Sequence, residues 1–234
     1  MRVPENEREL PISSSTPPAF TAEQRAVFTD VLNLLSAHKI PFAISGAFAL
    51  HQHTGIWRDT KDLDVFLVDD QVLTALAALR AAGFETEICD PVWLCKARRG
   101  QYFVDLITGM SNAVVIVQND WIERASHADI FGMQVKVLAA EELIASKLFV
   151  TRRERFDGAD VVHVIHGTAG KLDWSRILQP WANTGWCCSG RCCSMSTSIP
   201  HTPNTFRARS GPTFYPASAI SSIIPVRTRP PTAA

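Results

Sequence analysis

Apolar positions along this chain recur at helical or strand spacing between about residues 21 and 165, with turn residues between the segments. Helices are predicted at about residues 21–38, 47–53, 71–82 and 159–165, and a further helix begins near residue 140. Strands are predicted at residues 42–45, 63–68, 84–88, 93–96, 102–107 and 134–137. Because strands and helices alternate in a mixed order, the pattern indicates an α/β (α+β) fold, with a small mixed β-sheet flanked by helices.

Several residues at the ends of these segments have capping or turn character. Thr21 is a suitable N-cap for the first helix, and Gln24 stands three residues later, where a capping box has its second member. Gly55 and Gly83 follow predicted helices, as expected for C-terminal glycines. Gly100 lies between two predicted strands and indicates a hairpin turn.

The two ends of the chain lack this periodicity. Residues 1–20 are polar and rich in Pro, and residues 182–234 are rich in Ser, Thr, Pro and Arg. Both compositions are typical of disordered segments, because they bury too little apolar surface to offset the entropy of folding. We therefore expect a disordered N-terminal segment (1–20), one folded domain (21–181) with a helical C-terminal part, and a disordered tail (182–234).

The tail also contains two pairs of adjacent cysteines, Cys187-Cys188 and Cys192-Cys193. A zinc site is one interpretation, although zinc ligands are usually separated by two or more residues. A second interpretation comes from the genetic code. Residues 186–188 must be encoded TGG-TGY-TGY, and these bases read in another frame specify aliphatic residues. In that frame residues 182–199 would form a buried helix, so our hypothesis is a frameshift near residues 181–183.

Charge and cysteine usage narrow the class of protein. The first 182 residues hold all 23 acidic residues and 18 of the 23 basic ones, which gives this part a net charge of −5. An acidic body argues against a broad nucleic-acid surface. We find no signal peptide and no apolar run long enough to span a membrane. Cys89 and Cys95 are isolated, so we expect reduced thiols and a cytoplasmic location.

The strongest chemical signal is the pair Asp62 and Asp64, which flanks Leu63 at the start of a predicted strand. Residues two apart on a strand point to the same face, so both carboxylates would project together. Such a pair favours a divalent cation, and Mg²⁺ binds carboxylates together with substrate phosphates. Asp105 interrupts the apolar strand 102–107 and is the candidate third carboxylate, able to complete a site for one or two Mg²⁺ ions. The alternative is that Asp105 ends a strand and faces water.

A candidate phosphate site precedes the acidic pair. Gly46 stands at the predicted start of a helix, where backbone N–H groups attract an anion, and Ser45 adds a hydroxyl. The simpler interpretation of this pair is an ordinary turn. Arg58, Thr60 and Lys61 lie just before Asp62 and are either phosphate contacts or solvated loop residues. Lys147 lies on an apolar helix, and we expect its partner to be Glu142 or a triphosphate.

These residues resemble the signature of the nucleotidyltransferase superfamily, the polymerase-beta-like fold. Gly46-Ala47, the Asp62/Asp64 pair and the later acid Asp105 match that signature, although the superfamily usually has Gly or Ser where this chain has Ala47. The stretch from Gly46 to Asp64, and the later stretches 141–147 and 155–160, are most similar to small bacterial nucleotidyltransferases related to abortive-infection toxins. The resemblance covers about residues 22–181.

The resemblance implies an Mg²⁺-dependent enzyme that transfers a nucleoside monophosphate from an NTP to an acceptor, which could be a protein, an RNA or a small molecule. By this analogy Asp62, Asp64 and Asp105 are the catalytic and metal-binding residues. Nucleotide-binding roles fall to the following residues: Ser45, Gly46, Arg58, Thr60, Lys61 and Lys147. The alternative is a non-catalytic nucleotide-binding or antitoxin-like module that acts through a protein partner.

Overall fold

The computed structural model describes residues 18–110, 115–150 and 157–182. The elements follow one another as α1 (Ala22–Ala37), β1 (Phe42–Ile44), α2 (Gly46–Thr54), β2 (Asp62–Leu67), α3 (Asp69–Ala81), β3 (Glu85–Asp90), β4 (Leu94–Arg99), β5 (Tyr102–Ile107), α4 (Asn119–Arg124), β6 (Ser126–Ile130), β7 (Met133–Val137), α5 (Ala140–Val150), α6 (Gly158–Gly167) and α7 (Trp174–Ala182). The predicted α/β (α+β) class is confirmed.

Every predicted helix and strand is present, with ends that differ by a few residues, and α4, β6 and α7 were not predicted. The helix α4 has six residues, too few for a helical pattern to be recognised. The strand β6 reads Ser-His-Ala-Asp-Ile, which is mostly polar, and α7 contains Pro180. The proposed tail and its cysteines lie outside the described residues, as do residues 1–17, so the predicted boundaries of the domain stay predictions.

The predicted capping box at α1 is only half correct. Thr21 is the N-cap, and its hydroxyl accepts a hydrogen bond from the backbone N–H of Gln24 at 3.0 Å. The side chain of Gln24 does not turn back to the cap; its Nε2 donates to the carbonyl of Thr60 at 3.3 Å instead. This bond fixes the loop before β2 against α1.

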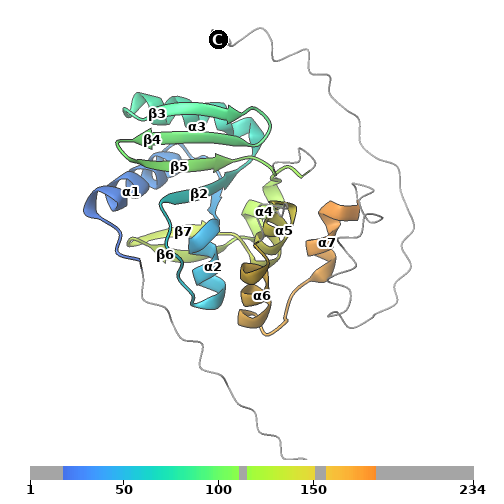
Figure 1. Ribbon diagram of the computed structural model, residues 1–234. Helices are drawn as coiled ribbons and strands as arrows, with labels where there is room; N and C mark the ends of the chain where they lie inside the picture. Colours follow the sequence, from blue (N-terminus) through green and yellow to red (C-terminus); the bar gives the residue numbers. More distant parts are fainter. Residues whose placement is uncertain (1–17, 111–114, 151–156, 183–234) are drawn as a thin grey trace, which may run out of the picture. The chain divides into compact units, whose positions relative to one another are not determined.

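The seven strands form one mixed sheet in the order β3-β4-β5-β2-β1-β7-β6 (Figure 1). The pairs β2/β5 and β1/β7 are parallel, and the other neighbours are antiparallel. The strands β3, β4 and β5 form a meander, with Gly100 in the predicted hairpin turn between β4 and β5. This topology places β5 directly beside β2.

Side chains of β2 alternate between two apolar clusters. Leu63, Val65 and Leu67 belong to a large cluster that includes residues of α1 and α3. Phe66 belongs to a second cluster on the other face, where its ring stacks on Trp121 of α4 at 6.3 Å. Because strand residues two apart share a face, Asp62 and Asp64 lie on the same face as Phe66.

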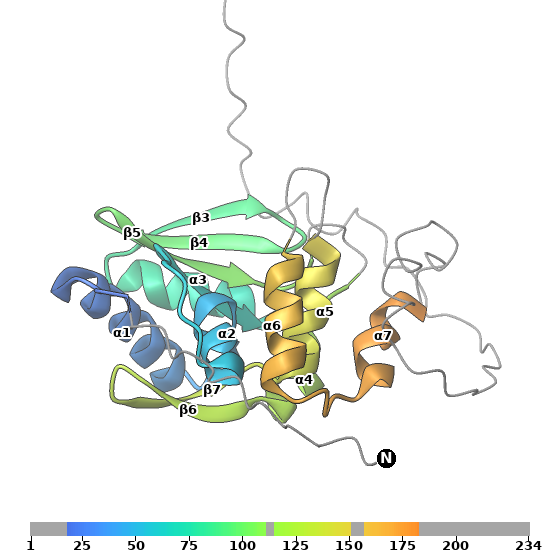
Figure 2. The same cartoon turned by 60° about the horizontal axis from the view of Figure 1, so that its bottom comes forward.

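The helices α2, α5 and α6 pack together beside the sheet (Figure 2). The approach of α6 to α2 is close, since a Cβ on Gly167 would lie 2.3 Å from the carbonyl oxygen of His53. Buried Glu142 of α5 connects two further helices, because its carboxylate accepts bonds from Arg176 of α7 at 2.6 and 2.7 Å and from Arg124 of α4 at 3.1 Å. None of the described helices is long and apolar enough to cross a membrane.

Candidate active site

Three carboxylates converge where β2 and β5 run side by side. The parallel register places Asp64 opposite Asp105, with Asp62 two residues earlier on β2. One oxygen from each of the three acids lies within 4.8 Å of the others, and all three side chains are partly exposed. The structure therefore brings together the acids that the sequence analysis selected.

The apolar neighbours of these acids explain their position. Leu63, Val104 and Leu106 are fully buried on the opposite face, so the pleat turns the acids outward. Thr60 orients the first acid, since its hydroxyl lies 2.9 Å from both the carbonyl oxygen and Oδ1 of Asp62. A strand pair with one face in the core thus presents a fixed group of oxygens on the other.

The turn between β1 and α2 lies directly against Asp64. The backbone N–H of Ser45 donates to the carbonyl of Asp64 at 2.9 Å. Gly46, the first residue of α2, has a φ of 59°, and a Cβ there would lie 1.9 Å from Oδ2 of Asp64. Two features therefore require glycine at this position: the left-handed backbone conformation and the closeness of the Asp64 carboxylate. The first turn of α2, with its free N–H groups, adjoins the acidic group.

Lys96 of β4 is a neighbour that the sequence analysis missed. Its Nζ donates to Oδ1 of Asp105 at 2.6 Å, and the register pairs these two residues across β4 and β5. Burial raises the pKa of Asp105, while the bond from Lys96 lowers it and the charge of Asp62 raises it. Burial is the largest of these effects, so the Asp105 carboxylate is a better proton acceptor than an exposed one.

The donor set of this group fits Mg²⁺. Hard divalent cations prefer carboxylate oxygens and keep positions for water and phosphate. Three carboxylates that each offer one oxygen within 4.8 Å supply that chemistry. All three side chains are partly exposed, so an ion from the solvent can reach their oxygens.

Two of the predicted nucleotide-binding cations contact a different acid. Lys147 is buried, and its Nζ lies 2.6 Å from Oδ2 of Asp160 and 3.7 Å from Oδ2 of Asp157. Nη1 of Arg58 contacts both oxygens of Asp160, at 2.9 and 2.8 Å. The expectation that Glu142 is the partner of Lys147 is wrong, because Glu142 binds two arginines. Asp160 is the residue that joins Lys147 and Arg58.

Two other predicted nucleotide-binding residues, Lys61 before β2 and Ser45 before α2, differ in their surroundings. Lys61 is exposed and forms no ion pair with a described residue. Ser45 is buried at 3% exposure and its side chain does not cap α2. The contact of Ser45 with the acidic strand is thus made by its backbone N–H, whereas Lys61 is an exposed charge next to Asp62 in the sequence.

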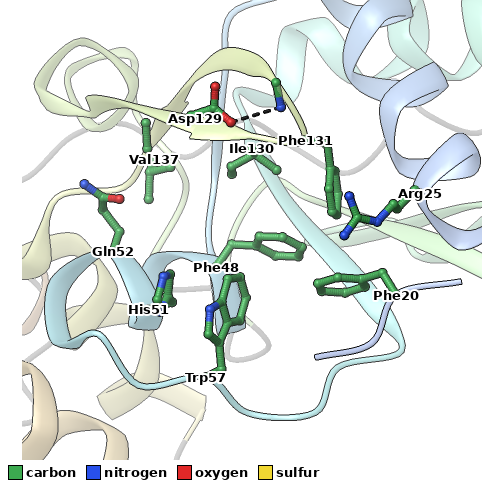
Figure 3. A pocket seen from close by; sticks show the side chains of 12 residues that line it. Phe20, Arg25, Phe48, His51, Gln52, Trp57, Asp129, Ile130, Phe131 and Val137 are labelled. Carbon is green, nitrogen blue, oxygen red and sulfur yellow. Dashed lines mark hydrogen bonds between the residues drawn. The ribbon is translucent and has the colours of Figure 1, made fainter. Parts of the chain in front are cut away.

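Residues of α2 and of the β6–β7 hairpin line a separate pocket (Figure 3). Its volume is about 340 Å³, and the rings of Phe20, Phe48, Trp57 and Phe131 lie around it. The hairpin of β6 and β7 closes it, with Asp129 accepting a bond from the N–H of Gly132 at 2.9 Å. None of the three acids lines this pocket, so it is distinct from the carboxylate group.

A mixed sheet that brings three carboxylates close to the first turn of a helix agrees with the arrangement that the sequence resemblance implies. The chain itself belongs to the family described as "Nucleotidyl transferase of unknown function (DUF2204)", which it matches over residues 24–181. The match ends at residue 181, where the sequence pattern changes. None of the curated proteins matched the chain.

Solved structures of similar fold include three nucleotidyltransferase-related proteins. The antibiotic-resistance factor ANT(2″)-Ia is 14% identical, with a TM-score of 0.49 over 75% of this chain and 96% of its own. The lincosamide antibiotic adenylyltransferase LnuA is 14% identical, with a TM-score of 0.45 over 64% and 98%. An antigenic nucleotidyltransferase-like protein from Paracoccidioides brasiliensis is 17% identical, with a TM-score of 0.44 over 76% and 93%.

Proposed function

We propose that this chain is an Mg²⁺-dependent enzyme that transfers a nucleoside monophosphate from an NTP to a hydroxyl of an acceptor. The observation that supports this function is the convergence of Asp62, Asp64 and Asp105 beside the first turn of α2. Carboxylates at that distance repel one another, and phosphate-bound Mg²⁺ relieves the repulsion. Membership of a nucleotidyltransferase family gives the class of reaction.

Each residue of the site has a proposed role. Asp62 and Asp64 would hold Mg²⁺, and a bound ion would neutralise the charge that develops on the phosphates during transfer. The backbone at Ser45 and Gly46 offers N–H groups to a phosphate oxygen. Thr60 holds Asp62 in place, and the exposed ammonium of Lys61 contacts the triphosphate.

The cluster around Asp160 has a supporting role in this proposal. The guanidinium of Arg58 is half exposed and is a candidate phosphate contact, whereas the ammonium of Lys147 is buried against Asp160. We therefore assign Lys147 to holding Asp160, which in turn orients Arg58 toward the nucleotide. Bidentate arginine contacts suit phosphate oxygens.

The third acid receives the proton. As the acceptor oxygen bonds to the α-phosphorus, the bond from that phosphorus to the β-phosphate oxygen breaks and pyrophosphate leaves with the electron pair. The proton of the acceptor hydroxyl passes to Asp105, whose burial favours the protonated form.

The free thiols of Cys89 and Cys95 fit a reducing compartment, and we place the enzyme in the cytoplasm.

The test is incubation of the full chain with Mg²⁺, each of four NTPs labelled at the α-phosphate, and a cell lysate. We expect label on an acceptor, and its chemistry (protein, RNA or small molecule) can then be read from protease, nuclease and filtration treatments. Asp62→Asn should lower transfer at least about a hundredfold, because it removes an oxygen ligand of the ion.

Asp70→Asn is the matched control, since Asp70 is an exposed acid on α3 outside the carboxylate group. Transfer by Asp62→Asn at the rate of the unmodified chain contradicts the proposal. Nucleotide binding without any labelled acceptor supports instead a non-catalytic module that acts through a protein partner.

A further inference from the structure

Lys96 stands in the same row of the sheet as two of the three acids. Register places Asp64 opposite Asp105 on one side, and Lys96 opposite Asp105 on the other. The three side chains therefore share the exposed face, with the acid of β5 between its neighbours on β2 and β4. The contact of 2.6 Å between Lys96 and Asp105 is the shortest that either charged group makes with a described residue.

The surroundings of Lys96 keep its ammonium close to this acid. The side chains of Lys96 and Asp105 are 25% and 14% exposed, so solvent screens the pair only in part. The ammonium also lies 4.3 Å from the centre of the Phe103 ring, a cation–π distance. The Lys96 ammonium therefore has a second favourable contact, with the Phe103 ring, in addition to its ion pair with Asp105.

We propose that Lys96 is a built-in counter-ion of Asp105, which competes with the divalent cation for the Asp105 carboxylate. The inference rests on the proposed function, because it takes the three acids as the cation site. An ammonium and a divalent cation that share one carboxylate repel each other strongly in a partly buried site. A lysine stem is flexible enough to move its charge away, and the ring of Phe103 keeps it nearby.

This competition has a consequence for the order of binding. In the metal-free protein, the contact between Lys96 and Asp105 offsets part of the repulsion among the three acids. A cation without bound phosphate must displace Lys96 from Asp105 before it can bind. This displacement lowers the affinity of the three acids for the cation. The cation is then held firmly when the phosphates of an NTP bring further oxygen ligands.

The test measures Mn²⁺ binding to the full chain by electron paramagnetic resonance, without nucleotide. Lys96→Met removes the ammonium and keeps an unbranched side chain over Phe103. We expect this variant to bind Mn²⁺ about tenfold more tightly, the effect of removing one charge-assisted contact. Arg98→Met is the control, since Arg98 lies on the same face of β4 and stacks near the same ring, but forms no ion pair with a described acid.

The outcomes separate this inference from the proposed function. Tighter binding by Lys96→Met, with Arg98→Met within about twofold of the unmodified chain, supports the counter-ion. If the unmodified chain binds Mn²⁺ and Lys96→Met binds it equally or more weakly, the inference alone is overturned. If none of the three proteins binds Mn²⁺, the cation site itself is refuted.

A second measurement guards against a folding defect in the variant. In EDTA, Lys96→Met should melt at a lower temperature than the unmodified chain, because its three acids have lost a contacting positive charge. Saturating Mn²⁺ should narrow or reverse the difference in melting temperature, since a ligand that binds more tightly stabilises the folded state more. An equal difference in EDTA and in Mn²⁺ would show that Lys96 is merely structural.

Discussion

Gly46 has a backbone conformation and a neighbour that both exclude a side chain. Its φ is 59°, and a Cβ would lie 1.9 Å from Oδ2 of Asp64. The glycine thus lets the start of α2 and the acidic pair of β2 approach to contact distance. The geometry of the carboxylates depends on the absence of a single methyl group.

Gly46→Ala tests this dependence. We expect a loss of about 1–2 kcal/mol in the free energy of unfolding from the left-handed backbone, together with weaker Mn²⁺ binding from the displaced carboxylate. Gly132→Ala is the control, because its φ is 81° and its Cβ would meet nothing within 4 Å. The control should lose stability and keep its Mn²⁺ affinity. Equal Mn²⁺ affinities in the two variants would contradict the steric role of Gly46.

At the scale of single residues, the sequence predicts which acids form the site better than it predicts the side chains that contact them. Asp62 and Asp64 stand out because a strand pattern with two carboxylates on one face is recognisable locally. Lys96 stands at the end of a predicted strand and looks like a solvated charge. Its role follows from the register of β4 against β5, and that register depends on where the hairpin turn falls.

The helices α5 and α6 are joined by a buried charge cluster around Asp160. Its carboxylate contacts Lys147 at 2.6 Å, and Arg58 reaches it from the loop before β2. Removing one partner from a buried ion pair leaves an uncompensated charge, which is strongly unfavourable. The cluster therefore connects the loop of the site to the helices beside it.

Asp160→Asn should lower the free energy of unfolding by about 3 kcal/mol, because the buried ammonium of Lys147 would lose the charged carboxylate that lies 2.6 Å from it. Asp30→Asn is the comparison, since its pair with Arg99 is exposed and should contribute less than about 1 kcal/mol. Urea unfolding of both variants measures the difference. Similar losses in the two variants would show that burial does not strengthen the Asp160 cluster.

Elements with a repeated pattern were predictable, and short or polar ones were not. The apolar spacing of α1 and α3 spans several turns and predicts both helices. The strand β6 is at the sheet edge and three of its five residues are exposed, so its polar sequence carries no alternation. The order of strands in the sheet arises from long-range pairing, which local pattern does not encode.

The stability of the whole molecule should depend on pH through His51. Burial lowers the pKa of His51 from its ordinary value of 6.5, and a hydrogen bond to the Gly55 backbone opposes this weakly. The unfolded chain then binds more protons than the folded one below pH 6.5, so stability should fall as the pH drops from 7.5 to 5.5.

Urea unfolding at pH 7.5 and 5.5 measures this dependence. In His51→Gln the fall should be smaller than in the unmodified chain, because the titrating group is gone. His127→Gln removes an exposed histidine of β6 and should leave the fall unchanged. A fall of the same size in His51→Gln would exclude this histidine as the cause.

The frameshift hypothesis also belongs to the scale of the whole chain. The family match ends at residue 181, at the proposed position of the frameshift. Sequencing the gene should reveal a single-base insertion or deletion near codons 181–183, with an aliphatic helix encoded after correction. An intact frame that encodes Cys187 and Cys188 in independent isolates would refute the hypothesis.

The interior strand β1, which lies between β2 and β7, has consequences for how the protein folds during synthesis. It has only three residues, and its two neighbours are β2 and the much later β7, which pairs with it through Ile44 and Val137. A nascent chain on the ribosome therefore exposes one edge of β1 until Val137 has left the exit tunnel. Because distant pairings form slowly, we expect the turn between β1 and α2, which contains Gly46, to become rigid late, after all three acids have been synthesised.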